Sequence, residues 1–348
     1  MFTIGTGSLL SSNELTIGNI PRISAKSDNN GVLGHFDTVD NVNARHAENF
    51  ITVNFFGANG GVFYHPYKAS VEMKVHILKI ADINLSKATG TFLASALRRS
   101  LTGFDYGSQL SSSKLRELDF KIQLPTKNNQ PDFEFMEQFI GQLEQSYFQR
   151  LDDYLSVTGL NDIELTAAEQ QALAEFESWE WQSYNLEALF GKSTRGKRLK
   201  SADRIVGSLP FVTAGEADEG VSAFIGNDVQ VFSRNTTTID MFGSAKYRNY
   251  DYGGDDHIAV VHTQDLPKNA AIFVTSAIHK VSCAGQFDYG RNFYAKDADA
   301  LTIQLPTTNN QPDYAKMETL ISALQKLVIG EVVNYTEERL QLTEALVC

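Results

Sequence analysis

The sequence predicts an α+β protein in which two tandem β-rich domains are separated by long antiparallel, coiled-coil-like helices with pseudo-twofold symmetry. Three observations support this: an internal repeat that covers the chain, short β-rich runs at the start of each copy, and a heptad stripe at its end. A length of 348 residues suits two domains of ordinary size. With 42% hydrophobic and 21% charged residues, the chain has material for two folded cores.

The two copies match most closely near their ends. Residues 122–126 read Ile-Gln-Leu-Pro-Thr and recur at 303–307, and residues 128–132 read Asn-Asn-Gln-Pro-Asp and recur at 309–313. Earlier matches pair Gly18-Asn19-Ile20-Pro21 with Gly207-Ser208-Leu209-Pro210, Gly31-Val32 with Gly220-Val221, Asn49 with Asn235, Phe56-Gly57 with Phe242-Gly243, Tyr64 with Tyr250, and Phe104-Asp105-Tyr106-Gly107 with Phe287-Asp288-Tyr289-Gly290. The separation falls from 189 residues between Gly18 and Gly207 to 181 between Ile122 and Ile303, so the second unit is slightly shorter.

Each unit begins with short β-rich runs that Gly and Asn interrupt. Examples are residues 49–53, which read Asn-Phe-Ile-Thr-Val, and residues 271–274, which read Ala-Ile-Phe-Val. We therefore expect the first domain over residues 1–130 and the second over residues 190–311.

Each unit ends in a predicted helix. Asp132 follows Pro131 as a helix N-cap, and a heptad seam comprises Met136, Ile140, Leu143, Tyr147, Leu151 and Tyr154. A similar stripe in the second unit comprises Met317, Leu320, Leu324, Leu327 and Ile329. A further helical stretch is predicted from about Ala167 to Leu189, with Leu173, Phe176 and Trp179 available for packing. These patterns predict a helical spacer over residues 131–189 and a C-terminal helix over residues 312–348 that packs on it.

The net charge of −12 is concentrated in one segment. Between Asp132 and Glu187 the chain has 13 acidic residues and one basic residue, Arg150, and the remaining 29 acids and 29 bases cancel. The flanking domains are therefore neutral overall and free to carry local basic patches. We interpret the acidic segment as a solvated helical face, and the alternative is a docking surface for a basic partner.

Several classes of protein are not supported by the sequence. No run approaches the roughly 18 apolar residues of a membrane span, and the N-terminus lacks the pattern of a signal peptide, so we expect a cytoplasmic protein without a membrane partner. Cys283 and Cys348 are too few for a disulfide framework, and the seven histidines show no metal-ligand spacing. No Gly-Lys-Ser/Thr phosphate loop is present, which argues against ATP use.

Two enzyme interpretations fail on the repeat and on missing residues. The glycine-rich residues 53–61 look like an adenine methyltransferase cofactor loop, but the counterpart at 241–245 has lost the later glycines, and no Asn-Pro-Pro-aromatic tetrapeptide occurs. Pro131-Asp132 and Pro312-Asp313 look like the start of a nuclease motif, but no spaced Glu-x-Lys follows. The sequence predicts no catalytic residue, no cofactor and no metal in this chain.

The duplicated motifs resemble a known family. They are the loop Arg195-Gly196-Lys197-Arg198-Leu199, then Leu209-Pro210-Phe211-Val212-Thr213, the turn Val62-Phe63-Tyr64-His65-Pro66, the Tyr-Gly loop, and Ile-x-Leu-Pro running into Pro-Asp and a Met-bearing helix. Together they resemble the specificity (S) subunits of type I restriction-modification enzymes, and more closely the short subunits of BcgI-like type IIB systems. The resemblance spans essentially the full length.

The resemblance implies two target-recognition domains that bind double-stranded DNA at a bipartite target. Adenine methylation and DNA cleavage would lie in partner methyltransferase or fused nuclease-methyltransferase subunits, together with S-adenosylmethionine and Mg²⁺. The first unit departs from the pattern, because Gly5-Thr6-Gly7-Ser8-Leu9 replaces the basic loop. The predicted helices are shorter than those of many type I subunits, which favours the compact type IIB relative.

One segment is conspicuously basic and is a candidate for phosphate contact. A loop that also carries Gly and Ser contains Lys192, Arg195, Lys197, Arg198, Lys200 and Arg204, against the single acid Asp203. Such a loop suits phosphate neutralisation, and one of its cations could reach a guanine edge. The alternative is a solvated surface loop.

The loops after the two Tyr-Gly turns are candidates for base readout. The first loop offers Ser108, Gln109, Ser111 and Lys114, and the second offers Arg291, Asn292 and Tyr294. Tyr106 and Tyr289 themselves are expected in the core, whereas His65 and Arg248, near the second turn of each unit, are weaker DNA-contact candidates. Arg98 and Arg99 lie in a helix-like run and fit ordinary surface equally well.

The helix length gives an expectation for the target. A helix of about 25 residues is roughly 37 Å long, and one turn of DNA is about 34–36 Å. Half-site centres about one helical turn apart would suit two readers on one face of a duplex. An alternative interpretation is a scaffolding or interaction protein that kept the duplicated fold without DNA binding. A third interpretation is a stand-alone modification enzyme.

Overall fold

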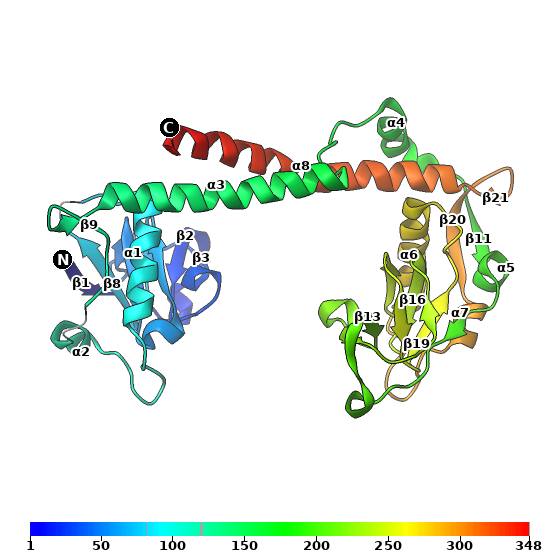
Figure 1. Cartoon of the computed structure of the whole chain (residues 1–348), viewed down its shortest axis with the longest axis horizontal. Coiled ribbons are helices and arrows are strands. Elements are labelled where there is room, and N and C mark those ends of the chain that lie inside the picture. The colour runs from blue at the N-terminus through cyan, green and yellow to red at the C-terminus, as the bar shows by residue number, and fades with distance from the viewer. Residues whose placement is uncertain (82, 119–120, 348) are drawn as a thin grey trace. The chain divides into compact units, whose positions relative to one another are not determined.

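The computed structural model describes residues 1–81, 83–118 and 121–347, and it divides them into two compact units. Residues 1–154 and 335–348 form unit 1, and residues 155–334 form unit 2 (Figure 1). Cys348 lies outside the described residues, and Cys283 is exposed with a free thiol. No helix in the described part of the chain is both long and apolar enough to cross a membrane.

In the described residues of unit 1, strands form two four-stranded sheets. The antiparallel sheet has the order β1 (Phe2–Thr6), β8 (Val75–Ile80), β5 (Phe50–Asn54), β6 (Val62–His65). The other sheet has the order β3 (Val32–Phe36), β2 (Ile17–Ile23), β7 (Ala69–Val71), β4 (His46–Ala47), with β2 and β7 parallel. The predicted strand at residues 49–53 is thus confirmed as β5.

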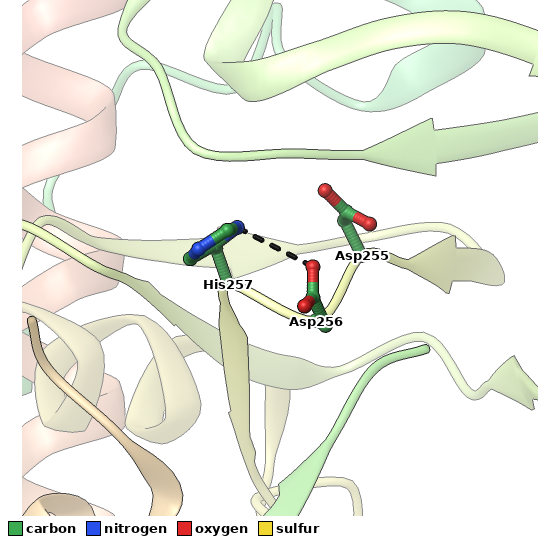
Figure 2. Close-up of side chains that lie close together, drawn as sticks. All are labelled: Asp255, Asp256 and His257. Carbon is green, nitrogen blue, oxygen red and sulfur yellow. Dashed lines mark ion pairs between the residues drawn. The ribbon is translucent and has the colours of Figure 1, made fainter. Parts of the chain in front are cut away.

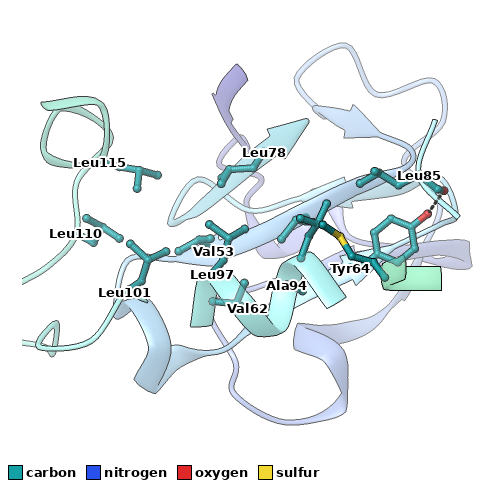
Figure 3. Packing of buried hydrophobic residues seen from close by; sticks show 13 residues of the cluster. Val53, Val62, Tyr64, Leu78, Leu85, Ala94, Leu97, Leu101, Leu110 and Leu115 are labelled. Carbon is teal, nitrogen blue, oxygen red and sulfur yellow. Dashed lines mark hydrogen bonds between the residues drawn. The ribbon is translucent and has the colours of Figure 1, made fainter. Parts of the chain in front are cut away.

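Helix α1 (Lys87–Ser100) packs on the first sheet to make the core of unit 1. Ser86 caps the helix by accepting a hydrogen bond from the Thr89 amide. Leu93 and Leu97 of the helix are fully buried in one cluster with residues of the strands. Figure 3 shows Leu97 in this cluster with Val53 and Leu78. Residues three to four apart face the same side of a helix, so α1 presents one apolar stripe to the sheet. The basic pair Arg98 and Arg99 lies exposed in its last turn, as expected of a helical surface.

Unit 2 repeats both sheets in the same order. The first is β12 (Thr194–Arg195), β19 (Ile258–Val261), β16 (Thr236–Asp240), β17 (Ala245–Arg248), and the second is β14 (Val221–Ile225), β13 (Val206–Val212), β18 (Tyr252–Gly254), β15 (Val231–Phe232). Helix α6 (Lys268–Ser282) takes the place of α1, and the short helices α2 (Ser112–Glu117) and α7 (Ala295–Ala300) follow the two Tyr-Gly loops. The structure therefore confirms an α+β chain with a duplicated β-rich domain.

Residues 271–274 were predicted as a β-rich run, and this is wrong because they lie inside α6. The buried positions Ala270, Ala271, Val274 and Ile278 follow the three-to-four residue spacing of a helix face. A run of four apolar residues is too short to show its period, so strand and helix cannot be told apart from it.

The single helix predicted from about Ala167 to Leu189 is also wrong. Helix α4 (Ala167–Glu175) is followed by strand β11 (Trp181–Asn185) and helix α5 (Leu186–Phe190). Strand β11 pairs antiparallel with β20 (Thr302–Thr308), which continues to β21 (Gln311–Pro312). Ser183 of β11 lies 121 residues from its partner Gln304 in β20, so this pairing is a tertiary effect that local pattern does not show. The expected packing of Trp179 is confirmed, since it is buried with Leu320.

Two long helices follow the repeated Pro-Asp. Strands β9 (Thr126–Lys127) and β10 (Gln130–Pro131) lead into α3 (Phe133–Thr158), and β21 leads into α8 (Tyr314–Val347). Asp132 accepts a hydrogen bond from the Phe135 amide at 3.0 Å, and Asp313 accepts one from the Lys316 amide at 3.0 Å. These bonds satisfy amides that the first turn leaves free, so the predicted N-cap is confirmed.

Within unit 1, the part of α8 that contains Tyr335 and Arg339 packs antiparallel to α3. Arg339 donates to Glu144 at 2.5 Å, and the ring of Tyr335 contacts that of Phe148 at 5.7 Å between centroids. The order of partners runs in opposite directions on the two helices, which confirms antiparallel packing there.

The predicted seam is confirmed only in part, since Ile140 and Leu151 are half-buried and three of its other residues are exposed. Met136 of the seam is fully buried, but Leu143, Tyr147 and Tyr154 are 53%, 67% and 59% exposed, while Phe148 and Leu155 are buried. In the second stripe Met317 and Leu320 are buried and Leu324 and Leu327 are exposed. Apolar side chains occur on more than one face of each helix, so heptad spacing alone selected a row beside the packed one.

Glu169 ties α4 to α8 within unit 2. Its carboxylate accepts from the Thr166 amide at 2.8 Å and from the Ser322 hydroxyl at 2.6 Å, and forms an ion pair with Lys326 at 3.2 Å. The hydrogen bond from Ser322 is the largest of the causes that lower the pKa of Glu169 to about 2.

We expect Glu169→Gln to lower the free energy of unfolding of unit 2 by about 1–3 kcal/mol, because it removes a buried charged acceptor from the Thr166 amide and from the half-buried side chains of Ser322 and Lys326. The depressed folded-state pKa means that the contribution is present above the ordinary value of 4.5 and is lost as pH falls toward 2. Urea unfolding at pH 7 and pH 3 measures both effects. Glu175→Gln on the exposed face of α4 is the matched control, and an equal loss in both variants would contradict the assignment.

Candidate nucleic-acid interface

The basic loop, residues 192–204, is held by its backbone against the turn between β18 and β19. The Gly196 amide donates to Ile258 O at 3.1 Å, and the Lys197 amide donates to Gly254 O at 2.9 Å. A Cβ at position 196 would lie 2.2 Å from Asp255 O, so only glycine allows this approach. The backbone of the loop is therefore fixed while its side chains remain free to point outward.

The structure places the predicted cations of this loop on the surface. Lys192, Arg195, Lys197, Arg198 and Lys200 are all exposed. Lys197 and Arg198 line a surface hollow of about 540 Å³ together with Asp228 and Gln230. Exposed cations on a fixed backbone are an arrangement that can neutralise phosphates without first ordering the loop.

An acidic turn, residues 255–257, contacts the basic loop through a hydrogen bond and an ion pair. Asp255, Asp256 and His257 bring possible metal-ligand atoms within 4.8 Å of one another (Figure 2). These groups already have partners: Asp255 accepts from the Leu199 amide at 3.4 Å, and Asp256 lies 3.6 Å from Arg195 and 3.3 Å from His257. The turn thus anchors the loop, and it neutralises part of the charge of Arg195.

The corresponding loop of unit 1 has the same backbone and different side chains. The Gly7 amide donates to Val75 O at 3.2 Å and the Ser8 amide donates to Val71 O at 2.9 Å, and a Cβ on Gly7 would lie 2.2 Å from Val71 O. Gly7 is therefore equivalent to Gly196, so Ser8 corresponds to Lys197 and Leu9 corresponds to Arg198. The expected departure of the first unit from the basic pattern is a real difference in surface chemistry.

Arg45 supplies a cation at this first loop, and it was not among the residues predicted from the sequence. Its guanidinium donates to Thr6 O at 3.0 Å, and its amide donates to the Ser8 hydroxyl at 3.0 Å. Arg45 is exposed and lies 37 residues from Ser8 in the chain. No match to the other copy marks this position, so only the fold reveals the pairing.

The Tyr-Gly loops have equivalent backbones in the two units. Asp105 accepts from the Ser108 amide at 2.7 Å, and Asp288 accepts from the Arg291 amide at 2.9 Å. By this equivalence Ser108 corresponds to Arg291, and Gln109 corresponds to Asn292. Ser111, which precedes α2, corresponds to Tyr294, which precedes α7.

The candidates on these loops differ in how free they are to contact a ligand. Ser108, Lys114 and Arg291 are exposed, whereas Gln109, Ser111, Asn292 and Tyr294 are half-buried. Arg291 stacks over Phe287 at 5.3 Å and pairs with Asp297 at 3.2 Å. The Asn292 side-chain oxygen is buried and has no hydrogen-bond partner in the described part of the chain. Arg291 is therefore the better placed of the two for base contact.

In unit 2 the basic loop and the Tyr-Gly loop meet. The guanidinium of Arg195 lies 5.3 Å from the ring centroid of Tyr294, and the ammonium of Lys296 lies 5.9 Å from it. In unit 1, Arg116 of α2 donates to Ile4 O of β1 at 3.3 Å, which brings the helix after the Tyr-Gly loop beside the strand that leads into the first loop. Each unit thus assembles its own candidate surface from two separate segments.

His65 and Arg248 do not belong to this surface, and their prediction as DNA contacts is corrected. His65 is 0% and Arg248 is 1% exposed. Both occupy the last position of equivalent strands, where His65 bonds to Thr52 at 2.9 Å and Arg248 donates to Thr238 at 2.9 Å. Polar groups this deeply buried are held by internal hydrogen bonds, so they serve packing.

Tyr106 and Tyr289 were expected in the core, and this is wrong because they are 81% and 85% exposed. The preceding Phe104 and Phe287 pack against the two cores instead. In both Phe-Asp-Tyr-Gly turns the phenylalanine faces inward and the tyrosine outward, and residue type alone does not distinguish the two rings.

The first part of the chain is similar in sequence to known proteins. Residues 1–151 match the family profile described as type I restriction modification DNA specificity domain. The specificity subunit S.BcgI of a type II restriction enzyme from Heyndrickxia coagulans is 32% identical over 151 residues, which is 43% of this chain and 43% of that protein. The match thus spans less than half of that relative.

A solved structure extends the likeness in fold to the full length. The S subunit of a type I restriction-modification system from M. genitalium superposes with a TM-score of 0.62 over 99% of this chain and 92% of that one, at 14% identity. The likeness in sequence is thus to DNA specificity domains and is limited to residues 1–151, unit 2 repeats the same elements, and the whole chain shares the fold of that S subunit.

Proposed function

We propose that this chain is the DNA-specificity subunit of a restriction-modification enzyme, in which each unit reads one half of a bipartite duplex target. The observation that carries the proposal is a constant backbone with different side chains at matched positions. Ser8 of unit 1 corresponds to Lys197 of unit 2, Ser108 corresponds to Arg291, and Ser111 corresponds to Tyr294. Base edges are distinguished by hydrogen-bond donors and acceptors, so such differences let two similar domains prefer different bases.

The chain itself would carry no catalysis. We propose that adenine methylation and strand cleavage belong to methyltransferase or fused nuclease-methyltransferase partners, which would also hold S-adenosylmethionine and Mg²⁺. The site of action would be the cytoplasm, where these partners meet the DNA. The role of this chain is then to place a partner on its target and to exclude other sequences.

Selection from a random duplex library tests the function. The full chain, isolated together with its partner subunits, is incubated with the library at low salt, and the retained duplexes are sequenced. Enrichment of a defined motif supports the recognition function. Retention of no duplex at low salt would support the scaffolding alternative, for which the segment of charge −12 would be the docking surface.

Exchange of the matched loop residues is expected to change only one half-site at a time. Arg291→Ser should lower affinity for the preferred base at one position by about tenfold, as loss of a base contact costs about 1–3 kcal/mol, and leave the other half-site unchanged. The reverse exchange, Ser108→Arg, should alter preference only at the other half-site. Competition binding with single-base variants of the selected duplex measures this, and equal weakening at both half-sites would show that Arg291 is structural.

A further inference from the structure

An exposed tyrosine occupies the same place in both units. Tyr106 is 81% and Tyr289 is 85% exposed, although each follows a phenylalanine that packs inward. The residues just beyond these tyrosines differ between the copies, since Ser108-Gln109 corresponds to Arg291-Asn292. The ring is thus constant where its neighbours vary.

Each tyrosine rests on a second aromatic ring. Tyr106 stacks on Phe56 with 6.1 Å between ring centroids and an interplanar angle of 19°, and Tyr289 meets Phe242 edge to face at 5.2 Å. These phenylalanines are half-buried. Because each tyrosine touches its partner ring with one side, most of its surface remains available to a ligand.

The supporting rings are themselves fixed by equivalent turns. The Phe56 amide donates to Asn54 at 2.8 Å, and the Phe242 amide donates to Asp240 at 2.9 Å. The glycines that follow have φ angles of +57° and +86°, and a Cβ there would lie 2.6 Å from Leu101 O in unit 1 and 2.0 Å from Ser282 O in unit 2. Each ring is therefore presented on a rigid support, which lowers the entropy lost on binding.

The loop that carries each tyrosine is closed on itself as well. Asp105 and Asp288 accept backbone amides of their own turns, at 2.7 Å from Ser108 and 2.7 Å from Gly290. Such Asx turns set the direction of the residue after the aspartate. The two tyrosines are consequently matched in sequence, exposure and backbone support.

A constant ring beside variable polar groups fits a contact that does not depend on base identity. Every base has a π-face, so aromatic stacking on bases tolerates any sequence, whereas hydrogen bonds to base edges do not. Side chains inserted between base steps partly unstack them and help a protein follow the duplex.

We propose that Tyr106 and Tyr289 are a matched pair of aromatic wedges, each of which stacks on a base at its own half-site and unstacks one base step. They add affinity without adding base preference. This inference rests on the proposed recognition of duplex DNA. In each loop the tyrosine would bind the duplex by stacking, and the residues that follow it would make the base-specific contacts.

The test compares Tyr106→Ala and Tyr289→Ala with Tyr106→Phe and Tyr289→Phe in the full chain bound to its partner subunits. On the duplex selected by the wild-type complex, each alanine variant should bind about tenfold more weakly, because stacking contributes on that order per base. The phenylalanine variants should bind like the wild type, and the selected motif should stay the same in all. Tyr147→Ala, at a ring 67% exposed on α3, is the control and should have no effect.

The unstacking is read from 2-aminopurine placed in turn at each adenine position of the half-sites. Its fluorescence should rise at one step per half-site with the wild type, and the rise at one half-site should vanish with the alanine variant of its own unit. Alanine variants that bind like the wild type, a changed base preference, or no fluorescence rise at any position would overturn the wedge. If the wild-type complex selects no duplex, the recognition function itself fails, and that result differs from all of these.

Discussion

Replacing Arg195, Lys197 and Arg198 by glutamate is expected to weaken binding to every duplex, whatever its sequence, by at least roughly a hundredfold near 0.15 M salt. Each lost phosphate contact removes about 0.9 from the slope of log affinity against log salt, so three contacts should reduce the slope by about 2.7. The effect is general because phosphates carry no base information. Affinity measured over a series of salt concentrations gives the slope directly.

Two controls separate loss of charge from loss of loop structure. Arg195 also pairs with Asp256 and covers the ring of Tyr294, so its replacement disturbs the loop itself. Lys197→Glu with Arg198→Glu leaves those contacts in place and should still reduce the slope by about 1.8. Arg98→Glu with Arg99→Glu, at the exposed end of α1, is the matched pair elsewhere. An unchanged slope in the loop variants would refute phosphate contact there.

Mild acid is expected to destabilise unit 1 through His65. Burial lowers the pKa of this imidazole from 6.5 to about 4. Between these values the unfolded chain binds a proton that the folded chain does not, so stability is greatest above pH 6.5 and declines as pH falls toward 4. At about 1.36 kcal/mol per pKa unit, the loss approaches roughly 3 kcal/mol.

Urea unfolding of the wild type and of His65→Gln at pH 7, 5.5 and 4.5 measures this loss. Glutamine can still bond to Thr52, and it does not titrate, so the variant should lose less stability over the same interval. The comparison uses the change with pH, so it holds even if the substitution itself costs stability at pH 7. Parallel pH profiles for the two proteins would contradict the assignment.

The repeat predicted the architecture because the matched residues have structural roles that few other residue types can fill. Asn49 and Asn235 both adopt positive φ, at 50° and 64°, and Asp132 and Asp313 both cap a long helix. Such positions tolerate few residues and so remain recognisable in both copies. One match failed: Tyr64 corresponds to Tyr247 rather than Tyr250, because both hydroxyls meet the side chain of the matched asparagine, Asn49 or Asn235.

That error follows from a change in loop length. The hairpin between β5 and β6 carries residues 57–60 as an extra turn, and the hairpin between β16 and β17 is shorter. Alignment by residue type passes over such a difference, whereas the strand register does not. The correct register also shows that His65 and Arg248 are equivalent buried residues of the two units, one an imidazole and the other a guanidinium.

The candidate surface was predicted in part. Cations of the basic loop were found because charge clusters are visible in sequence, and their exposure follows from the cost of burying charge. Arg45 was missed because its proximity to Ser8 is created by folding alone. Tyr106 and Tyr289 were assigned to the core because large aromatic side chains are usually buried, and a rigid exposed ring is an exception that needs the structure to be seen.

Separate recognition by the two units is tested most directly by the sequences of the duplexes that the full chain and its partner subunits select from a random library. We expect two separated blocks of defined bases with unselected bases between them, and we expect substitutions at Ser108 and Arg291 to change different blocks. A single continuous block, or one block altered by both substitutions, would contradict the claim that each unit reads its own half of the target.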